Sequence, residues 1–109
     1  MSNGFNVMGP LQLRIMNFIW EHGMSTVHDV HGALNEDTGS PQLAYTTILT
    51  VMRNLVRRQL LSQMPAPHGR SHVFQPTVTA DNYRSQLMSD ICDAFFDGNT
   101  STMIEAINQ

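Results

Sequence analysis

Residues 44–59 carry the clearest helical pattern in the chain, and the two sides of that helix differ in chemistry. Apolar side chains recur at the spacing of a buried helical stripe, at Ile48, Val51, Met52, Leu55 and Val56. The opposite side is polar, and four of its residues fall within an arc of about 60°, namely Thr46, Thr50, Arg53 and Arg57. We therefore expect one side of this helix to pack on a core while the other stays accessible.

The polar side of this helix is positively charged and free of carboxylates. Between Asp37 and Asp81 the chain has no Asp or Glu. That stretch nevertheless holds four of the six basic residues, Arg53, Arg57, Arg58 and Arg70. The chain as a whole has a net charge of −3, so its remaining parts are acidic. Because affinity for phosphate follows local charge, this strip points to nucleic acid as a partner.

Length and composition fit one folded domain. The chain has 109 residues, of which 41% are hydrophobic, so a modest core is expected rather than disorder. No apolar run approaches the roughly 18 residues that a spanning helix needs, and we expect no membrane insertion. The N-terminus lacks the features of a secretory signal, which favours a cytoplasmic protein. A single cysteine, Cys92, excludes an internal disulfide and a multi-thiolate metal site.

The order of the expected elements predicts the fold class. Helices are expected from Pro10 to the stop at Gly23, from Thr26 with its capping partner Asp29, and over 44–59. Two strands at 60–64 and 71–75 follow, then helices over 80–97 and 101–108. We predict a mainly α fold with a small β-hairpin wing, that is, a winged helix-turn-helix followed by C-terminal dimerisation helices.

Three segments are expected to have separate roles. Residues 1–8 are predicted to form a flexible tail, residues 9–76 a winged-helix DNA-binding domain, and residues 77–109 a C-terminal helical dimerisation arm. Within the second segment, hydroxyls can approach a groove floor closely and guanidinium groups can grip guanine or neutralise phosphate. Base reading is assigned to Thr46, Thr47, Thr50 and Arg53. Flanking and phosphate contacts are assigned to Asn54, Arg57, Arg58 and Arg70, the last near His68 at the hairpin tip.

The apolar face predicted for residues 80–97 is wider than one small core requires. Its apolar side chains span about 140°, and beyond about 200° with Cys92 and Phe96 included, whereas a stripe of about 100° suffices for one core. The extra apolar width indicates that a second subunit packs on this face. The alternative that stays open is that the last helix of the same chain covers it. Dimerisation is assigned to Tyr83, Leu87, Met88, Ile91, Phe95, Phe96 and Ile104.

The histidines do not predict a metal site, and no residues form a recognisable catalytic group. His28 and His31 lie three residues apart, but a firm site needs further ligands, so we expect two solvated side chains, no metal and no cofactor. His72 alternates with Phe74 and is expected to be half-buried. No nucleophile with an adjacent base or phosphate-binding glycine loop is present, so an enzyme is not expected. Two alternatives stay open: a metal- or small-molecule-responsive winged-helix sensor, and a winged-helix protein-interaction module.

Four pieces of sequence in the right order resemble the penicillinase and methicillin-resistance repressors and the related copper-responsive repressors (the BlaI/MecI/CopY type). They are Gly9-Pro10-Leu11, Thr26-Val27, Leu43-Ala-Tyr-Thr-Thr-Ile48 and Gly69-Arg70-Ser71-His72-Val73-Phe74-Gln75-Pro76. The resemblance covers about residues 9–98. It implies a dimeric repressor on a palindromic double-stranded operator, with a membrane metalloprotease sensor as a partner of the antibiotic-responsive members.

Some residues depart from the family pattern. Asn54 stands where the family has arginine, and Gln59 replaces the usual helix-ending glycine. The cysteine cluster of the copper-responsive members is absent, so copper sensing is not implied. The Asn–Phe bond that the protease cuts in relatives has no counterpart around residues 93–96, which leaves the inducing signal open.

Overall fold

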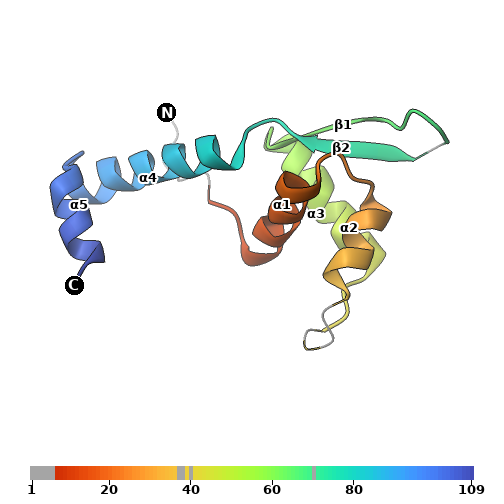
Figure 1. Cartoon of the computed structure of the whole chain (residues 1–109), viewed down its shortest axis with the longest axis horizontal. Helices are drawn as coiled ribbons and strands as arrows, with labels where there is room; N and C mark the ends of the chain where they lie inside the picture. Colours follow the sequence, from red (N-terminus) through yellow and green to blue (C-terminus); the bar gives the residue numbers. More distant parts are fainter. Residues whose placement is uncertain (1–6, 37–38, 40, 70) are drawn as a thin grey trace. The chain divides into compact units, whose positions relative to one another are not determined.

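The part of the chain that the computed structural model describes, residues 7–36, 39, 41–69 and 71–109, folds into five helices and one hairpin. In chain order these are α1 (Pro10–His22), α2 (Val27–Leu34), α3 (Tyr45–Arg57), β1 (Leu61–Pro65), β2 (His72–Pro76), α4 (Ala80–Phe96) and α5 (Thr100–Ile107) (Figure 1). This order confirms the predicted mainly α fold with a small β-hairpin. Two compact units are present: Met8–Thr79, which holds α1 to β2, and a second that holds α4 and α5.

The first two helices begin at the residues that the sequence indicates. Gly9 precedes α1 and Pro10 takes its first position, where a missing N–H costs no hydrogen bond. α2 begins with a capping box: Thr26 Oγ1 accepts from the N–H of Asp29 at 3.0 Å. In return, Asp29 Oδ2 accepts from the N–H of Thr26 at 3.0 Å. The predicted cap of α2 is therefore confirmed.

α3 ends in a Schellman motif built without glycine. The N–H of Leu60 bonds the carbonyl of Leu55 at 2.9 Å. The N–H of Gln59 bonds the carbonyl of Val56 at 2.9 Å. Gln59 has φ +64°, the left-handed region that glycine occupies at the lowest cost. The helix ends at Arg57, earlier than predicted, because Gln59 turns the chain toward β1.

The hairpin pairs antiparallel, with Phe74 opposite Gln63. Both strands lie one residue later than predicted, because Leu60 is part of the α3 cap and the register then pairs Pro65 with His72. Phe74 also exchanges two backbone hydrogen bonds with Ser25, of 3.0 and 2.8 Å. This bridge joins the segment before α2 to the outer edge of β2.

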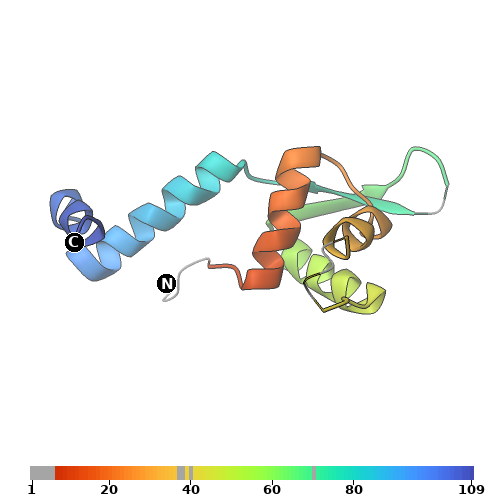
Figure 2. The same cartoon turned by 60° about the horizontal axis from the view of Figure 1, so that its bottom comes forward.

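The core of the first unit lies where α1, α2 and α3 meet the hairpin (Figure 2). Side chains with almost no exposed surface come from each of these elements: Ile15, Met16, Ile19, Val30, Ile48, Met52, Leu55, Leu61 and Phe74. Trp20 Nε1 donates to the carbonyl of Val78 at 3.0 Å and ties α1 to the segment after β2. This packing holds α3 with its apolar side inward.

Two residues lie differently from the prediction. Met8, assigned by the sequence to the tail, is only 8% exposed and belongs to the first compact unit. His72, expected to be half-buried, is exposed because it starts β2 at the loop end of the hairpin, opposite Pro65. Among the described residues, none of the helices combines the length and the apolar character needed to cross a membrane.

Candidate nucleic-acid interface

The outer side of α3 presents its hydroxyl and guanidinium groups to solvent. Five of the predicted interface residues are exposed there: Thr46, Thr47, Thr50, Arg53 and Arg57. The opposite side is fully buried at Ile48, Met52 and Leu55. The helical wheel thus predicted the separation of the two sides correctly, and the outer one offers donors at successive turns to an approaching ligand.

The start of α3 is held by the end of α2. Ala44 precedes α3 and provides no capping oxygen. The N–H of Leu43 instead donates to Asn35 Oδ1 at 2.7 Å. The carbonyl of Leu43 accepts from Asn35 Nδ2 at 2.9 Å and from His31 Nε2 at 3.0 Å. These three bonds tie Leu43 to the end of α2 and thereby set the direction in which the first turn of α3 points.

Two residues predicted to flank the interface are joined to α1. Gln12 Nε2 donates to Asn54 Oδ1 at 3.0 Å, and Gln12 Oε1 accepts from Arg58 Nη1 at 2.9 Å. The same Oε1 accepts from the N–H of Gly9 at 2.9 Å. Asn54 and Arg58 are consequently half-buried rather than fully presented outward. They position α3 on α1, and their contacts with DNA stay predictions.

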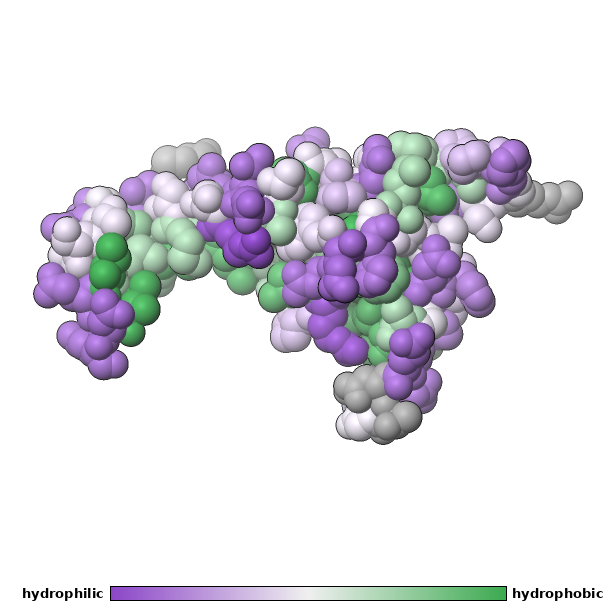
Figure 3. All heavy atoms as spheres, in the orientation of Figure 1, coloured by the Kyte–Doolittle hydropathy of each residue, from purple (hydrophilic) through white to green (hydrophobic). Residues whose placement is uncertain are grey.

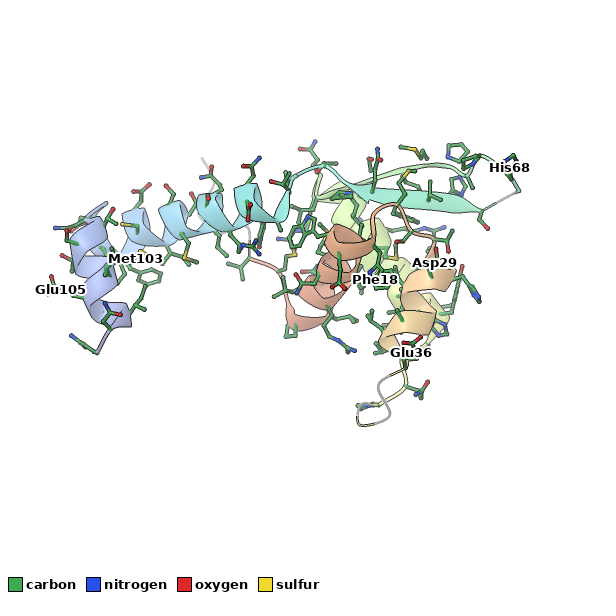
Figure 4. The ribbon with its side chains drawn as sticks, viewed as in Figure 1. Phe18, Asp29, Glu36, His68, Met103 and Glu105 are labelled. Carbon is green, nitrogen blue, oxygen red and sulfur yellow. The ribbon has the colours of Figure 1, made fainter. Side chains whose placement is uncertain are left out.

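The hairpin tip provides a further predicted contact. His68 lies there and is exposed (Figure 4). Gly69 beside it has φ +86°, a left-handed backbone conformation that glycine adopts without strain. Arg70, the predicted phosphate contact of the tip, lies outside the described residues.

The guanidinium groups of Arg53 and Arg57 are not neutralised. Within the described part of the chain, neither forms an ion pair or a hydrogen bond. The described carboxylates of the first unit belong to α1 and α2 and the turn after α2, at Glu21, Asp29 and Glu36. Because none of these described carboxylates pairs with them, both guanidinium groups keep their attraction for a phosphate.

A cavity of about 260 Å³ lies beside α3, between α2 and the hairpin. Its α3 wall is the row Tyr45, Leu49 and Arg53, and His28 of α2 and His72 of β2 also line it. The sequence did not indicate that these two histidines lie near Arg53. The spacing of Tyr45, Leu49 and Arg53, every fourth residue, was the available signal that a second surface of α3 faces the hairpin.

The predicted pair of solvated histidines is corrected by the structure. His31 is half-buried and bonded to the carbonyl of Leu43, whereas His28 is exposed. A larger cavity of about 660 Å³ adjoins α1 and α2, and Figure 4 shows Phe18, Asp29 and Glu36 around it. Across the described residues, no group of three or more His, Cys, Asp or Glu could hold a metal ion.

The second unit exposes several apolar side chains. Met88, Phe95 and Ile104 of the predicted dimerisation set are exposed, and Phe95 reaches 68%. The rest of the set is less accessible: Leu87, Ile91 and Phe96 are half-buried and Tyr83 is buried. Ile107, which the prediction omitted, is also 68% exposed. Figure 3 shows hydrophobic residues gathered over α5 and the adjoining end of α4.

The sequence matches known regulators along nearly its whole length. A family model described as "Penicillinase repressor" matches residues 8–109. The protein named transcriptional regulator BlaI, from two strains of Mycobacterium tuberculosis, is 32% identical over 84 residues. Those residues are 76% of this chain and 57% of the relative, so the chain spans little more than half the length of these relatives.

Solved structures share the fold at low sequence identity. The transcriptional regulator Tm0710 from Thermotoga maritima has a TM-score of 0.59 at 15% identity, covering 92% of this chain and 69% of that one. The adhesin competence repressor (AdcR) from Streptococcus pyogenes has a TM-score of 0.55 at 14% identity, covering 93% and 75%. These likenesses support the predicted fold, and the family match indicates transcriptional repressors rather than enzymes. The chain belongs to the penicillinase repressor family.

Proposed function

We propose that this chain is a transcriptional repressor that binds double-stranded DNA through the outer side of α3. The observation that carries the proposal is an exposed helix side with two unneutralised arginines, three threonines and no carboxylate. Such a surface suits both the phosphate backbone and the edges of bases in the major groove. The family of the chain supports the same role and suggests a penicillinase-type resistance gene as the regulated target.

The residues of this side divide by length and chemistry. Thr46, Thr47 and Thr50 are short enough to approach a groove floor, where their methyl groups can pack on thymine. Arg57, one turn beyond Arg53, is assigned to a phosphate contact. A repressor bound to the operator blocks transcription from the promoter. This role agrees with the cytoplasmic location expected from the sequence.

The α4–α5 unit supports a homodimer. The exposed apolar groups of Met88, Phe95, Ile104 and Ile107 form a surface that a second copy of the chain would remove from water. In a two-fold dimer, two α3 helices would meet the duplex about one helical turn apart, roughly 34 Å. The operator is therefore expected to be a palindrome.

Fluorescence anisotropy with labelled duplex DNA tests the proposal. We expect binding at about 50 mM salt that weakens steeply toward about 200 mM. Arg57→Ala should lower the affinity for all duplexes and reduce the salt slope by about one unit. Arg84→Ala is the matched control, because Arg84 lies on α4 in an ion pair with Asp81 at 2.7 Å. Absence of binding by the unaltered protein at low salt would refute the proposal.

A further inference from the structure

The cavity beside α3 is lined by groups that donate hydrogen bonds. Arg53 contributes a guanidinium, His28 and His72 contribute imidazoles, and Tyr45 and Ser71 contribute hydroxyls. Among the described residues that line it, none is Asp or Glu. A pocket with this lining suits an anion, because every polar group can turn a donor toward it and none repels it.

The larger cavity along α1 and α2 provides an internal contrast. Asp29 and Glu36 line that cavity, so negative charge there would be repelled. Each cavity is lined by two histidines, His28 with His22 in the larger one and His28 with His72 in the smaller one, but only the smaller one has an arginine in its lining. The preference for an anion is therefore a property of the smaller cavity and not of histidine content alone.

Arg53 lies between the outer side of α3 and the side that faces the cavity. On the helical wheel it lies about 20° from Thr46 on the outer side and about 40° from Leu49, which faces the cavity. Its guanidinium is exposed and makes no hydrogen bond or ion pair with another described residue. The same holds for the imidazoles of His28 and His72, so all three donors are accessible to one ligand.

We infer that this cavity holds one phosphate group of the DNA backbone, gripped by Arg53 together with His28 and His72. The inference rests on the proposed DNA-binding function and assigns Arg53 a positioning role in place of the base contact expected from the sequence. The volume of about 260 Å³ leaves ample room for a phosphate group, since one water occupies about 30 Å³. A phosphate held here would fix the register of the duplex against the outer side of α3.

The neighbours of the two imidazoles in this cavity do not repel an anion. The groups that face them are Tyr45 and Arg53 of α3, with Asp29 next to His28 on α2. The Asp29 carboxylate is bonded to the N–H of Thr26 and does not line this cavity.

The first test compares His28→Gln/His72→Gln with His22→Gln, a control on α1 that does not line this cavity. Anisotropy with a short duplex is measured at constant salt and constant pH. We expect the control to bind like the unaltered protein and the double variant to bind about three- to tenfold more weakly, because it has lost two donors to the phosphate. A double variant that binds as tightly as the control would overturn the inference.

The second test separates a phosphate contact from a base contact at Arg53. The preferred duplexes of the unaltered protein and of Arg53→Gln are selected from a random library. We expect the variant to select the same sequence with lower affinity, and Arg53→Lys to recover part of the loss. A changed base preference would overturn the inference while leaving DNA binding itself intact. If the unaltered protein binds no duplex, the proposed function fails instead.

Inorganic phosphate tests whether the occupant is a free anion. Amide chemical shifts are followed while phosphate is added to the protein at constant ionic strength. We expect weak shifts around His28, Arg53 and His72 at millimolar phosphate, removed by added duplex. Saturation at micromolar phosphate that persists when duplex is bound would overturn the assignment to the DNA backbone.

Discussion

At Gln59 the chain adopts a left-handed backbone, φ +64°, that a residue with a β-carbon takes at a cost of about 1–2 kcal/mol. The Schellman bonds of Leu60 and Gln59 hold it there, and the Thr77 hydroxyl donates to the carbonyl of Gln59. The sequence showed that the usual glycine was missing. It could not show whether α3 would continue past Gln59 or end there with Gln59 in a strained backbone conformation, because that depends on where β1 starts.

Gln59→Gly should therefore stabilise the first unit. Glycine removes the strain of the left-handed backbone in the folded state. It also raises the conformational entropy of the unfolded chain, which offsets part of that stabilisation, so the free energy of unfolding should rise by about 0.5–1 kcal/mol. Urea denaturation followed by circular dichroism measures it. Gln63→Gly, at an exposed position in β1, is the control and should be destabilising. A loss of stability in Gln59→Gly would contradict this account of the helix end.

At the scale of elements, the orientation of α3 depends on polar bonds that no pattern in the sequence indicated. The wheel predicted which side of α3 is buried, and capping rules predicted the starts of α1 and α2. The Gln12 bonds to Asn54 and Arg58 join residues more than forty positions apart in the chain. The cavity shared by His28, Arg53 and His72 likewise exists only once α2, α3 and the hairpin have packed.

A double-mutant cycle on Gln12 and Asn54 tests this link between α1 and α3. Gln12→Ala should reduce the free energy of unfolding by about 1–2 kcal/mol, since it leaves Asn54 and Arg58 with one partner fewer. In Gln12→Ala/Asn54→Ala, the combined loss should be smaller than the sum of the single losses by about 0.5 kcal/mol or more. Strictly additive losses would show that the hydrogen bond contributes nothing to the docking of α3.

At the scale of the whole molecule, the family and fold could be predicted from the sequence, while the homodimer stays a prediction. Helix order and the four matching segments were enough to indicate the family. The apolar face of α4 was predicted from its width. The accessible apolar side chains of this unit are Met88 and Phe95 of α4, Ile104 of α5, and Ile107 of α5, which the predicted dimerisation set omits. Which of these meet a second chain depends on packing between copies, which a single-chain pattern does not encode.

Substitutions on this surface should change the oligomeric state. Phe95→Asp and Ile104→Asp place a charge on the exposed apolar surface, and each should shift the molar mass in light scattering from dimer to monomer. Ser101→Asp adds the same charge in the first turn of α5, where a carboxylate is tolerated, and should leave the mass unchanged. A dimer that persists in both apolar variants would place the contact elsewhere.

The most direct measurement of the central claim is a map of backbone amide shifts while unlabelled duplex DNA is titrated into the labelled protein. We expect the largest changes in α3, at Thr46, Thr50 and Arg53, with smaller ones at His28 and His72, all reduced at high salt. Changes confined to α4 and α5, or a map that salt does not alter, would contradict it.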